Sequence, residues 1–263
     1  MQSENDKNKM SRENFVSNTL SRKRFQEILH LFHQSTQQLG DDRNKIKIVT
    51  YDDRKLVVKS FKTPNFINKI AYRFFRKSKA ARSYYNAQYL VKNNIGTPSP
   101  IAYLEQFSGV GLQESYYVSA YAAHDFTYRE ITNDEELQDK VNILQQFSKF
   151  MFDMHDAGIY FLDHSPGNTL IKKDGNNYHF SLVDLNRMKF YNIPYEDRLK
   201  NFERLSPKKW MYEVMGTAYA RLSDEDAHTT IETMWKYTLE FQKAFHKKKR
   251  VKHKLKGIFS RTR

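Results

Sequence analysis

The sequence predicts a two-lobed α+β fold, with a strand-rich first lobe and a mostly helical second lobe. Runs of β-branched and aromatic residues dominate the first half, whereas apolar residues recur at helical spacing after Ala122. A chain of 263 residues, 39% of them hydrophobic, is long enough for one large domain or two modest lobes. The expected parts are a disordered polar N-terminus (1–20), a first lobe (21–120), a second lobe (121–245) and a basic C-terminal tail (246–263).

Two pairs of β-rich runs are expected in the first lobe. The first pair flanks a turn at Tyr51–Arg54, and Lys59 closes its second strand. Between the pairs, apolar residues at helical spacing predict a basic helix over Asn65–Lys79 and a second helix from about Lys79 to Val91. The expected strands are Ile46–Val49, Leu56–Val58, Ile101–Phe107 and Ser115–Ala120.

Helices dominate the second lobe. Apolar residues along one side predict a long helix over Glu136–Ala157, which Gly158 ends. Two short β-rich runs, Thr169–Ile171 and Phe180–Val183, follow it and are separated by a turn. Further helices are expected to begin at Ser206-Pro207 and at Ser223–Glu225.

Positive charge is concentrated in two segments. The net charge is +14, and Arg54–Arg82 and Lys243–Arg263 each contain ten Lys or Arg residues and no acid. Such segments favour an anionic partner, either nucleic acid or a negatively charged membrane or glycolipid surface. The alternative is a solvated basic face and a frayed tail.

The composition excludes several classes of protein. There is no cysteine, so disulfides and thiolate metal sites are excluded. The segment Met1–Ser11 lacks the apolar core of a secretory signal, and no stretch approaches the ~18 apolar residues of a membrane span. We therefore expect a cytoplasmic protein, either soluble or peripheral on a membrane.

One ordered set of polar residues predicts phosphoryl transfer. Asp163 and Asn168 lie between the long helix and the hairpin, five positions apart, which is the spacing of Asp and Asn in a kinase catalytic loop. Asp184 ends the hairpin, and Lys59 has the context of the kinase strand lysine. Each residue alone is a weak signal, since such matches occur by chance. Their order along the chain is what predicts an ATP-dependent kinase.

The chemistry of phosphoryl transfer explains these residue types. Mg²⁺ is held against the nucleotide phosphates by hard oxygen ligands, which Asn168 and Asp184 can supply. Asp163 can accept the proton of the acceptor hydroxyl, and Lys59 can hold the α- and β-phosphates. The expected ATP site also includes Ala120, Tyr121 and Ala122, at the junction between the lobes.

Short segments spread along the chain match one known family. They are Val57–Lys62, Pro64–Phe66, Arg76–Ala80, Ile95–Pro98, Pro100-Ile101, Leu162–Asn168, Val183–Arg187 and Asn201–Leu205. The loop Ser165–Asn168 is the most specific of these segments. Over roughly residues 45–215 the chain resembles the bacterial lipopolysaccharide kinases, which are the Kdo and heptose kinases of the core oligosaccharide.

The resemblance implies a protein-kinase-like fold and ATP-dependent phosphorylation of a sugar hydroxyl on the lipid A–core glycolipid. It also implies a place at the inner face of the inner membrane, where the basic segments 54–82 and 243–263 would contact the anionic surface. The basic and aromatic stretch Phe66–Arg76 suits such an interface, and each Lys or Arg near an anionic surface contributes ~1 kcal/mol. Its apolar residues would otherwise pack on the first lobe.

The sequence departs from ordinary protein kinases in several places. It has no G-x-G-x-x-G loop, and the helix after Lys79 contains no Glu to pair with Lys59, so Asn86 and Gln88 are the nearest polar candidates. Phe161-Leu162 precedes Asp163, Leu185-Asn186 follows Asp184, and there is no Ala-Pro-Glu motif. The platform for protein substrates is therefore missing, which favours a glycolipid or small-molecule acceptor.

Other hypotheses remain at this level. The same fold would also suit a minimal atypical Ser/Thr protein kinase or a small-molecule phosphotransferase. A pseudokinase would be expected to lack Asp163, Asn168 or Asp184, and a nucleic-acid binder would be expected to show a recognisable motif, which is absent. We therefore expect no nucleic-acid partner. His164 and His155 are expected to pack structurally rather than to join the chemistry.

Overall fold

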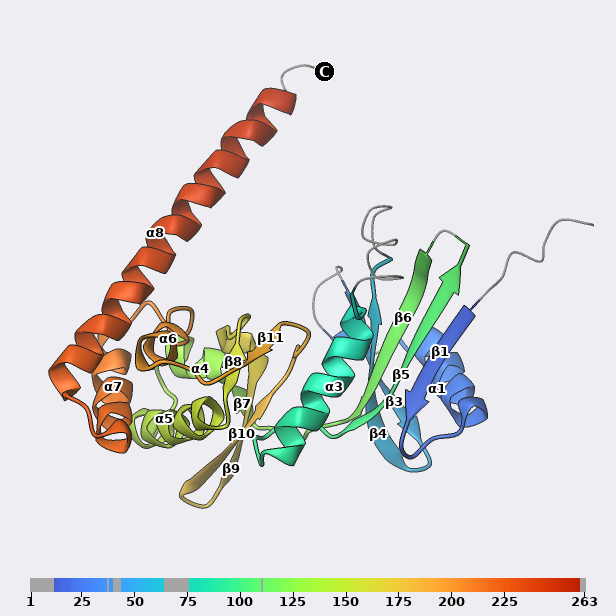
Figure 1. The fold of residues 1–263 in the computed structure, drawn as a ribbon, viewed down its shortest axis with the longest axis horizontal. Coiled ribbons are helices and arrows are strands. Elements are labelled where there is room, and N and C mark those ends of the chain that lie inside the picture. Colours follow the sequence, from blue (N-terminus) through green and yellow to red (C-terminus); the bar gives the residue numbers. More distant parts are fainter. Residues whose placement is uncertain (1–11, 37, 40–43, 64–75, 110, 261–263) are drawn as a thin grey trace, which may run out of the picture. The chain divides into compact units, whose positions relative to one another are not determined.

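The computed structural model describes residues 12–36, 38–39, 44–63, 76–109 and 111–260, and Figure 1 shows its helices and strands. The chain forms two compact units. The first extends to Ala123 and also contains Leu182–Arg187. The second contains His124–Ser181 and the chain from Met188 onward. A short segment from the second half of the sequence therefore belongs to the first unit.

An antiparallel six-stranded sheet organises the first unit, in the order β1-β5-β6-β4-β3-β2. The four strands expected from the sequence are confirmed as β3 to β6, and β1 and β2 are additional. The strands are β1 (Arg12–Ser17), β2 (Gln38–Leu39), β3 (Asn44–Tyr51), β4 (Arg54–Phe61), β5 (Pro100–Ser108) and β6 (Gly111–Ala120).

Strand β1 corrects the expectation of disorder for the described residues between 12 and 20. It pairs along its length with β5, with Phe15 opposite Leu104. The ring of Phe15 also lies 5.2 Å from that of Phe25. The segment is mostly polar, so its own propensity for a strand is weak, and the tertiary contacts with β5 determine its structure.

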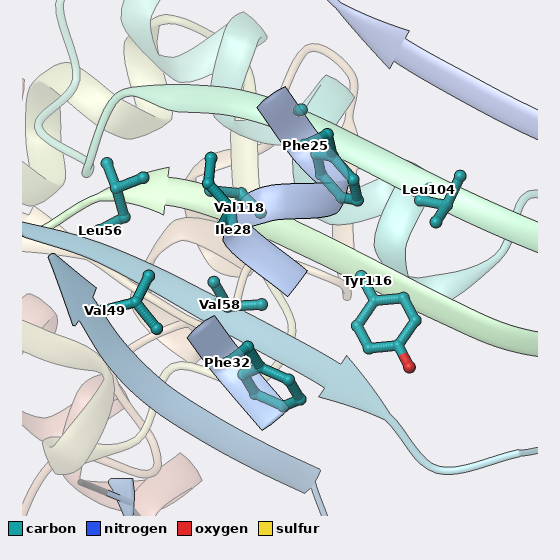
Figure 2. Packing of buried hydrophobic residues seen from close by; sticks show 10 residues of the cluster. Phe25, Ile28, Phe32, Val49, Leu56, Val58, Leu104, Tyr116 and Val118 are labelled. Atoms are coloured by element: carbon teal, nitrogen blue, oxygen red, sulfur yellow. The ribbon is translucent and has the colours of Figure 1, made fainter. Parts of the chain in front are cut away.

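Helix α1 (Arg22–Gln34), which the sequence pattern did not predict, covers one face of this sheet. Its buried residues Phe25, Ile28 and Phe32 recur at helical spacing, and Figure 2 shows them among the side chains of the sheet. Burial of each such side chain contributes about 1.5–3 kcal/mol. The sheet residues of this cluster are Val49, Leu56, Val58, Ala102, Leu104, Tyr116 and Val118.

Helix α3 (Lys79–Lys92) packs on the other face of the sheet, and its position agrees with the predicted second helix. Ser78 caps its first turn by accepting a hydrogen bond from the backbone N–H of Ala81. Side chains alternate along a strand, so Lys59 and Phe61 of β4 face α3 while Val58 faces α1. The buried cluster between α3 and the sheet consists of Ala80, Ala81 and Tyr84 of α3 with Phe61 and Tyr103 of the sheet.

The predicted basic helix over Asn65–Lys79 falls mainly on positions 64–75, which lie outside the described residues.

The second unit contains most of the helices, as expected. Figure 1 shows α5, α7 and α8 packed in sequence beside two small antiparallel sheets, β10-β9-β7 and β11-β8. The helices are α4 (Tyr128–Asn133), α5 (Lys140–Asp156), α6 (Tyr195–Lys200), α7 (Lys209–Ser223) and α8 (Ala227–Ser260). The strands are β7 (Phe126–Thr127), β8 (Ile159–Phe161), β9 (Thr169–Asp174), β10 (Asn177–Leu182) and β11 (Met188–Phe190), with a 3-10 turn η1 (Pro166–Asn168).

The ends of three predicted helices differ from the structure. Helix α5 begins at Lys140 rather than Glu136, because the preceding Asp139 has a left-handed backbone with φ 65°. Helix α7 begins just after the predicted Ser206-Pro207. Helix α8 begins at Ala227 and continues to Ser260, so most of the predicted basic tail is helical.

Gly158 ends α5, as predicted. Its φ is +70°, and its N–H donates to the carbonyl of His155. A Cβ there would lie 2.9 Å from the carbonyl oxygen of Tyr191, so both the conformation and the space require glycine.

In the described part of the chain, none of the helices combines the length and apolar character needed to cross a bilayer.

Candidate active site

The candidate residues fall into two groups, one in each unit. In the first unit, Lys59 of β4 is only 8% exposed and forms an ion pair with Asp184. Lys59 lies opposite Ile46 of β3 and Tyr117 of β6, so its backbone is held by ladders on both sides. The structure therefore brings together two residues that are 125 positions apart in the sequence.

Asp184 is presented by a segment fixed to the first unit. The N–H of Leu182 donates to the carbonyl of Gly96, and Thr97 Oγ1 donates to the carbonyl of Leu182 at 2.8 Å. Beyond Asp184, the amide of Asn86 on α3 donates to the carbonyl of Leu185 at 2.6 Å. Asn86 therefore does not take the place of the missing Glu beside Lys59, since it holds the backbone that follows Asp184.

The backbone of Asp184 is left-handed, with φ 61°. This conformation is uncommon for a residue with a side chain and persists where the surroundings enforce it, often at functional sites. Asn186 Nδ2 donates to Asp184 Oδ1 at 2.7 Å, and the Asp184 side chain is 37% exposed. The carboxylate is thus oriented by two partners while part of it stays accessible.

The predicted ATP residues Ala120, Tyr121 and Ala122 follow the end of β6. Ala120 lies opposite Leu56 and donates its N–H to the carbonyl of Ser99. Tyr121 donates its N–H to the carbonyl of Lys55 at 3.0 Å. These bonds place the segment on the strand next to the one that carries Lys59.

In the second unit, Asp163 and Asn168 lie on one loop between β8 and β9. Asn168 Nδ2 donates to the backbone carbonyl of Asp163 at 2.8 Å, and its N–H donates to the carbonyl of Ser165. The amide NH₂ is thereby committed to the loop, so the oxygen is the atom of Asn168 able to bind a cation. Asp163 and Asn168, five positions apart, thus lie at the two ends of a loop that these hydrogen bonds close.

Arg204 is a site residue that sequence reasoning missed. Its Nη1 donates to the Asp163 carboxylate and to the carbonyl of Leu162, both at 3.0 Å. Arg204 lies 41 positions from Asp163, and the segment Asn201–Leu205 was noted only as part of the family resemblance. A charge-assisted bond of this kind fixes the orientation of the carboxylate.

Gly167 lies close to the guanidinium group of a second arginine. A Cβ on Gly167 would lie 2.7 Å from Nη2 of Arg129, which comes from α4. Arg129 lies within a capping box in which Thr127 and Glu130 satisfy each other's backbone groups. The Ser-Pro-Gly-Asn loop therefore packs against a fixed helix start.

Both histidines near the loop are structural, as predicted. His164 is buried, stacks on Phe161 with ring centroids 5.2 Å apart, and is bonded to Thr169 Oγ1. His155 accepts a hydrogen bond from Tyr219 and donates one to Asn201. Burial lowers the pKa of each imidazole to about 3, so both stay neutral at physiological pH.

The donor atoms present suit Mg·ATP. Within the described residues, no three His, Asp or Glu side chains gather into a group that would hold a metal alone. Mg²⁺ in phosphotransferases is bound by one or two carboxylates together with substrate phosphates, so a complete protein cage is not required. Asp184, partly exposed and oriented, and the oxygen of Asn168 are ligands of the right type.

Comparisons with known proteins identify relatives. The model of the lipopolysaccharide kinase (Kdo/WaaP) family matches residues 38–233. The structure is similar to that of WaaP in complex with acyl carrier protein, with a TM-score of 0.61 and 15% identity over 89% of this chain and 98% of that chain. It also matches the Rio2 kinase–ADP/Mg²⁺–phosphoaspartate complex from Chaetomium thermophilum, with a TM-score of 0.44 and 13% identity over 78% of this chain and 71% of that chain.

No match was found among curated protein sequences. The likeness to WaaP confirms the predicted protein-kinase-like fold, with its strand-rich first part and helical second part.

Proposed function

Because the chain belongs to the lipopolysaccharide kinase (Kdo/WaaP) family, and is therefore an ATP-dependent kinase acting on the lipopolysaccharide core, we propose that it phosphorylates a sugar hydroxyl of the inner core. The acceptor sugar would be Kdo or heptose. The observation that carries the proposal is the closed loop in which Asn168 and Arg204 together hold Asp163.

Each candidate residue has a role in this reaction. Asp163 accepts the proton of the sugar hydroxyl as the hydroxyl attacks the γ-phosphate, and Arg204 keeps the carboxylate oriented for that transfer. Lys59 binds the α- and β-phosphates, and Ala120, Tyr121 and Ala122 contact the nucleotide. Asn168 and Asp184 would each supply an oxygen ligand to Mg²⁺, which would neutralise charge on the phosphates when bound.

The test is transfer of labelled γ-phosphate from Mg·ATP to lipopolysaccharide purified from a strain lacking this gene. The wild-type protein is expected to label the core. Asp163→Ala is expected to lower the rate about 10²–10⁴-fold, because it removes the group that accepts the proton. Asp153→Ala, which changes an exposed residue on α5, serves as the matched control and should retain activity.

Hydrolysis of the labelled product and identification of the labelled sugar distinguishes Kdo from heptose. If the wild-type protein binds Mg·ATP but does not label the core, the glycolipid assignment is wrong. A protein or a soluble small molecule would then be the acceptor to test, since the fold serves those acceptors equally.

We also propose that the protein contacts the inner face of the inner membrane through its basic segments 54–82 and 243–263. In the described part of α8, every side chain from Lys243 to Val251 is exposed. Phe245 is 55% exposed and Val251 is 50% exposed, beside the cations Lys247–Arg250. Exposed apolar side chains close to several cations suit contact with the surface of an anionic bilayer.

A further inference from the structure

A cavity of about 320 Å³ in the second unit borders the loop that carries Asp163. Leu162 and His164, on either side of Asp163, both line it, and so does Arg204. Because Arg204 also donates to the Asp163 carboxylate, one side chain joins the cavity wall to the proposed proton acceptor. A molecule in this cavity would therefore contact the residues that flank and orient Asp163.

The charged groups that line this cavity are of both signs. Three cations contribute to the lining, from Lys189, Lys200 and Arg204, against the two carboxyl groups of Asp197 and Glu203. Asp197 accepts a hydrogen bond from Tyr191 at 3.0 Å, and burial raises the pKa of Glu203. Arg204 is paired with Asp163, whereas Lys189 and Lys200 are exposed side chains whose ammonium groups can turn toward a ligand.

The cavity also offers aromatic and hydrogen-bonding surface. The rings of Tyr160 and Tyr191 have centroids 6.1 Å apart and planes inclined by 39°. Burial raises the pKa of each phenol to about 12, so both stay protonated; the hydroxyl of Tyr191 donates to Asp197, and its oxygen can still accept a hydrogen bond. Ring faces that can pack on the C–H groups of a sugar, beside polar groups that can bond its hydroxyls, are features of a carbohydrate pocket. The volume is at the lower end of the range for ligand sites.

We propose that this cavity is the acceptor subsite, and that Lys189 and Lys200 recognise an anionic substituent, a carboxylate or a phosphate, on the sugar bound there. The assignment rests on the proposed function, because it takes the acceptor to be a sugar phosphorylated beside Asp163. It adds the chemical class of the sugar and two residues that determine specificity. Neither lysine touches the reacting atoms, so both act on binding of the acceptor.

The proposal predicts that loss of the two lysines changes the KM for the acceptor but not kcat or the KM for ATP. Hydrogen bonds to charged groups are worth enough that losing them weakens binding by about ten- to a hundredfold. The double variant Lys189→Gln/Lys200→Gln is therefore expected to raise the KM for the lipopolysaccharide acceptor at least tenfold, with kcat and the KM for ATP within about twofold of wild type. The double variant Lys172→Gln/Lys173→Gln removes two cations from β9, away from the cavity lining, and is the matched control.

Binding measured without transfer keeps this test separate from the proposed function. Free Kdo, inorganic phosphate and glucose are titrated calorimetrically into wild-type protein and both double variants, in the absence of ATP. Binding of Kdo or phosphate by the wild type and the Lys172/Lys173 control, but not by the Lys189/Lys200 variant, supports the subsite, and the better probe identifies the substituent.

Three results would overturn the proposal: equal binding of glucose, an acceptor KM that the Lys189/Lys200 variant leaves unchanged, or no binding of any probe by the wild type. If the wild type binds the anions through these lysines yet transfers nothing to lipopolysaccharide, the proposed function fails and the anion site stands.

Discussion

Two buried histidines near the candidate site, His155 and His164, have pKa values far below the usual range. The consequence is easier to test for His155. Its neutral ring accepts from Tyr219 and donates to Asn201, whose own amide NH₂ donates to the carbonyl of Phe161, the strand residue just before the Asp163 loop. A protonated ring would have two N–H donors facing one hydroxyl and one carbonyl oxygen. Because the hydroxyl of Tyr219 could accept as well as donate, it is burial of the ring rather than its hydrogen bonds that disfavours the charged imidazole.

Stability should consequently fall in mild acid. The unfolded chain protonates this histidine below about pH 6.5, whereas burial lowers its folded-state pKa to about 3. Its contribution is therefore complete above pH 6.5 and is lost toward pH 3, by up to about 1.4 kcal/mol per pH unit. We expect the fall in unfolding free energy between pH 7.5 and 5.5 to be smaller in His155→Gln than in wild type. In the exposed control His246→Gln it should match wild type, and an unchanged fall in His155→Gln would contradict the prediction.

Loss of Lys59 and loss of Asp184, the partners of one ion pair, should lower the stability of the protein by different amounts. Asp184→Ala leaves the ammonium group of a residue that is only 8% exposed without its carboxylate, whereas Lys59→Met leaves a partly exposed carboxylate that still accepts from Asn186. Both variants should lose kinase activity. Asp184→Ala should also unfold more easily than Lys59→Met, by about 1–3 kcal/mol in chemical denaturation. Equal stabilities of the two variants would contradict this asymmetry.

Sequence spacing indicated which candidate residues lie together better than it indicated the residues that support them. Asp163 and Asn168 are five apart on one loop, so the pattern itself places them together. Arg204 reaches the same loop only because the chain folds back, and no periodicity marks such a contact. The pairing of Asn86 with a backbone carbonyl was equally invisible, since amides serve many partners.

At the scale of elements, the contact between α7 and α8 depends on one missing side chain. A Cβ on Gly216 of α7 would lie 2.6 Å from Cγ1 of Ile231 and 3.2 Å from its Cα. Glycine weakens a helix interior by about 1 kcal/mol relative to alanine, but here it permits close approach of the two helices.

Gly216→Ala should therefore destabilise the second unit despite the better helix propensity of alanine. Overpacking a well-filled contact costs typically about 1–3 kcal/mol, which exceeds the gain in propensity. Thermal unfolding followed by circular dichroism would measure the difference. Gly109→Ala is the control, because a Cβ there has nothing within 4 Å. A Gly216→Ala protein more stable than wild type would show that the helices can separate without cost.

Elements with strong periodicity were predictable, and those that depend on neighbours were not. The strands β3 to β6 and the helices α3 and α5 follow directly from alternating or helical patterns. Strand β1 is polar and exists through pairing with β5. The start of α5 moved to Lys140 because Asp134 caps the backbone of Glu136 and Asp139 turns left-handed, which are local bonds that apolar spacing does not encode.

At the scale of the whole molecule, the net charge of +14 predicts how the protein partitions between water and lipid. Binding to vesicles of phosphatidylcholine with one-third phosphatidylglycerol should be strong and should weaken with salt. Replacing Lys247–Arg250 with glutamine should weaken binding at least tenfold, because each cation contributes about 1 kcal/mol. Phe245→Ser should weaken it at high salt as well, since that contribution is apolar.

Co-sedimentation with the vesicles measures both effects, with Lys172→Gln/Lys173→Gln as the control for loss of charge elsewhere. Equal binding to vesicles of phosphatidylcholine alone, or full binding by the Lys247–Arg250 variant, would contradict contact between α8 and the anionic membrane surface.

The segment Leu182–Arg187 has a consequence for how the protein is made. It completes the first unit, yet the ribosome reaches it only after the 58 residues from His124 to Ser181, which belong to the second unit. At a synthesis rate of about 5–20 residues per second, the emerging first unit waits roughly 3–12 seconds for Asp184, the partner of Lys59. Neither unit can therefore be obtained by cutting the gene once, and a nascent chain halted before residue 182 would display an incomplete first unit to chaperones.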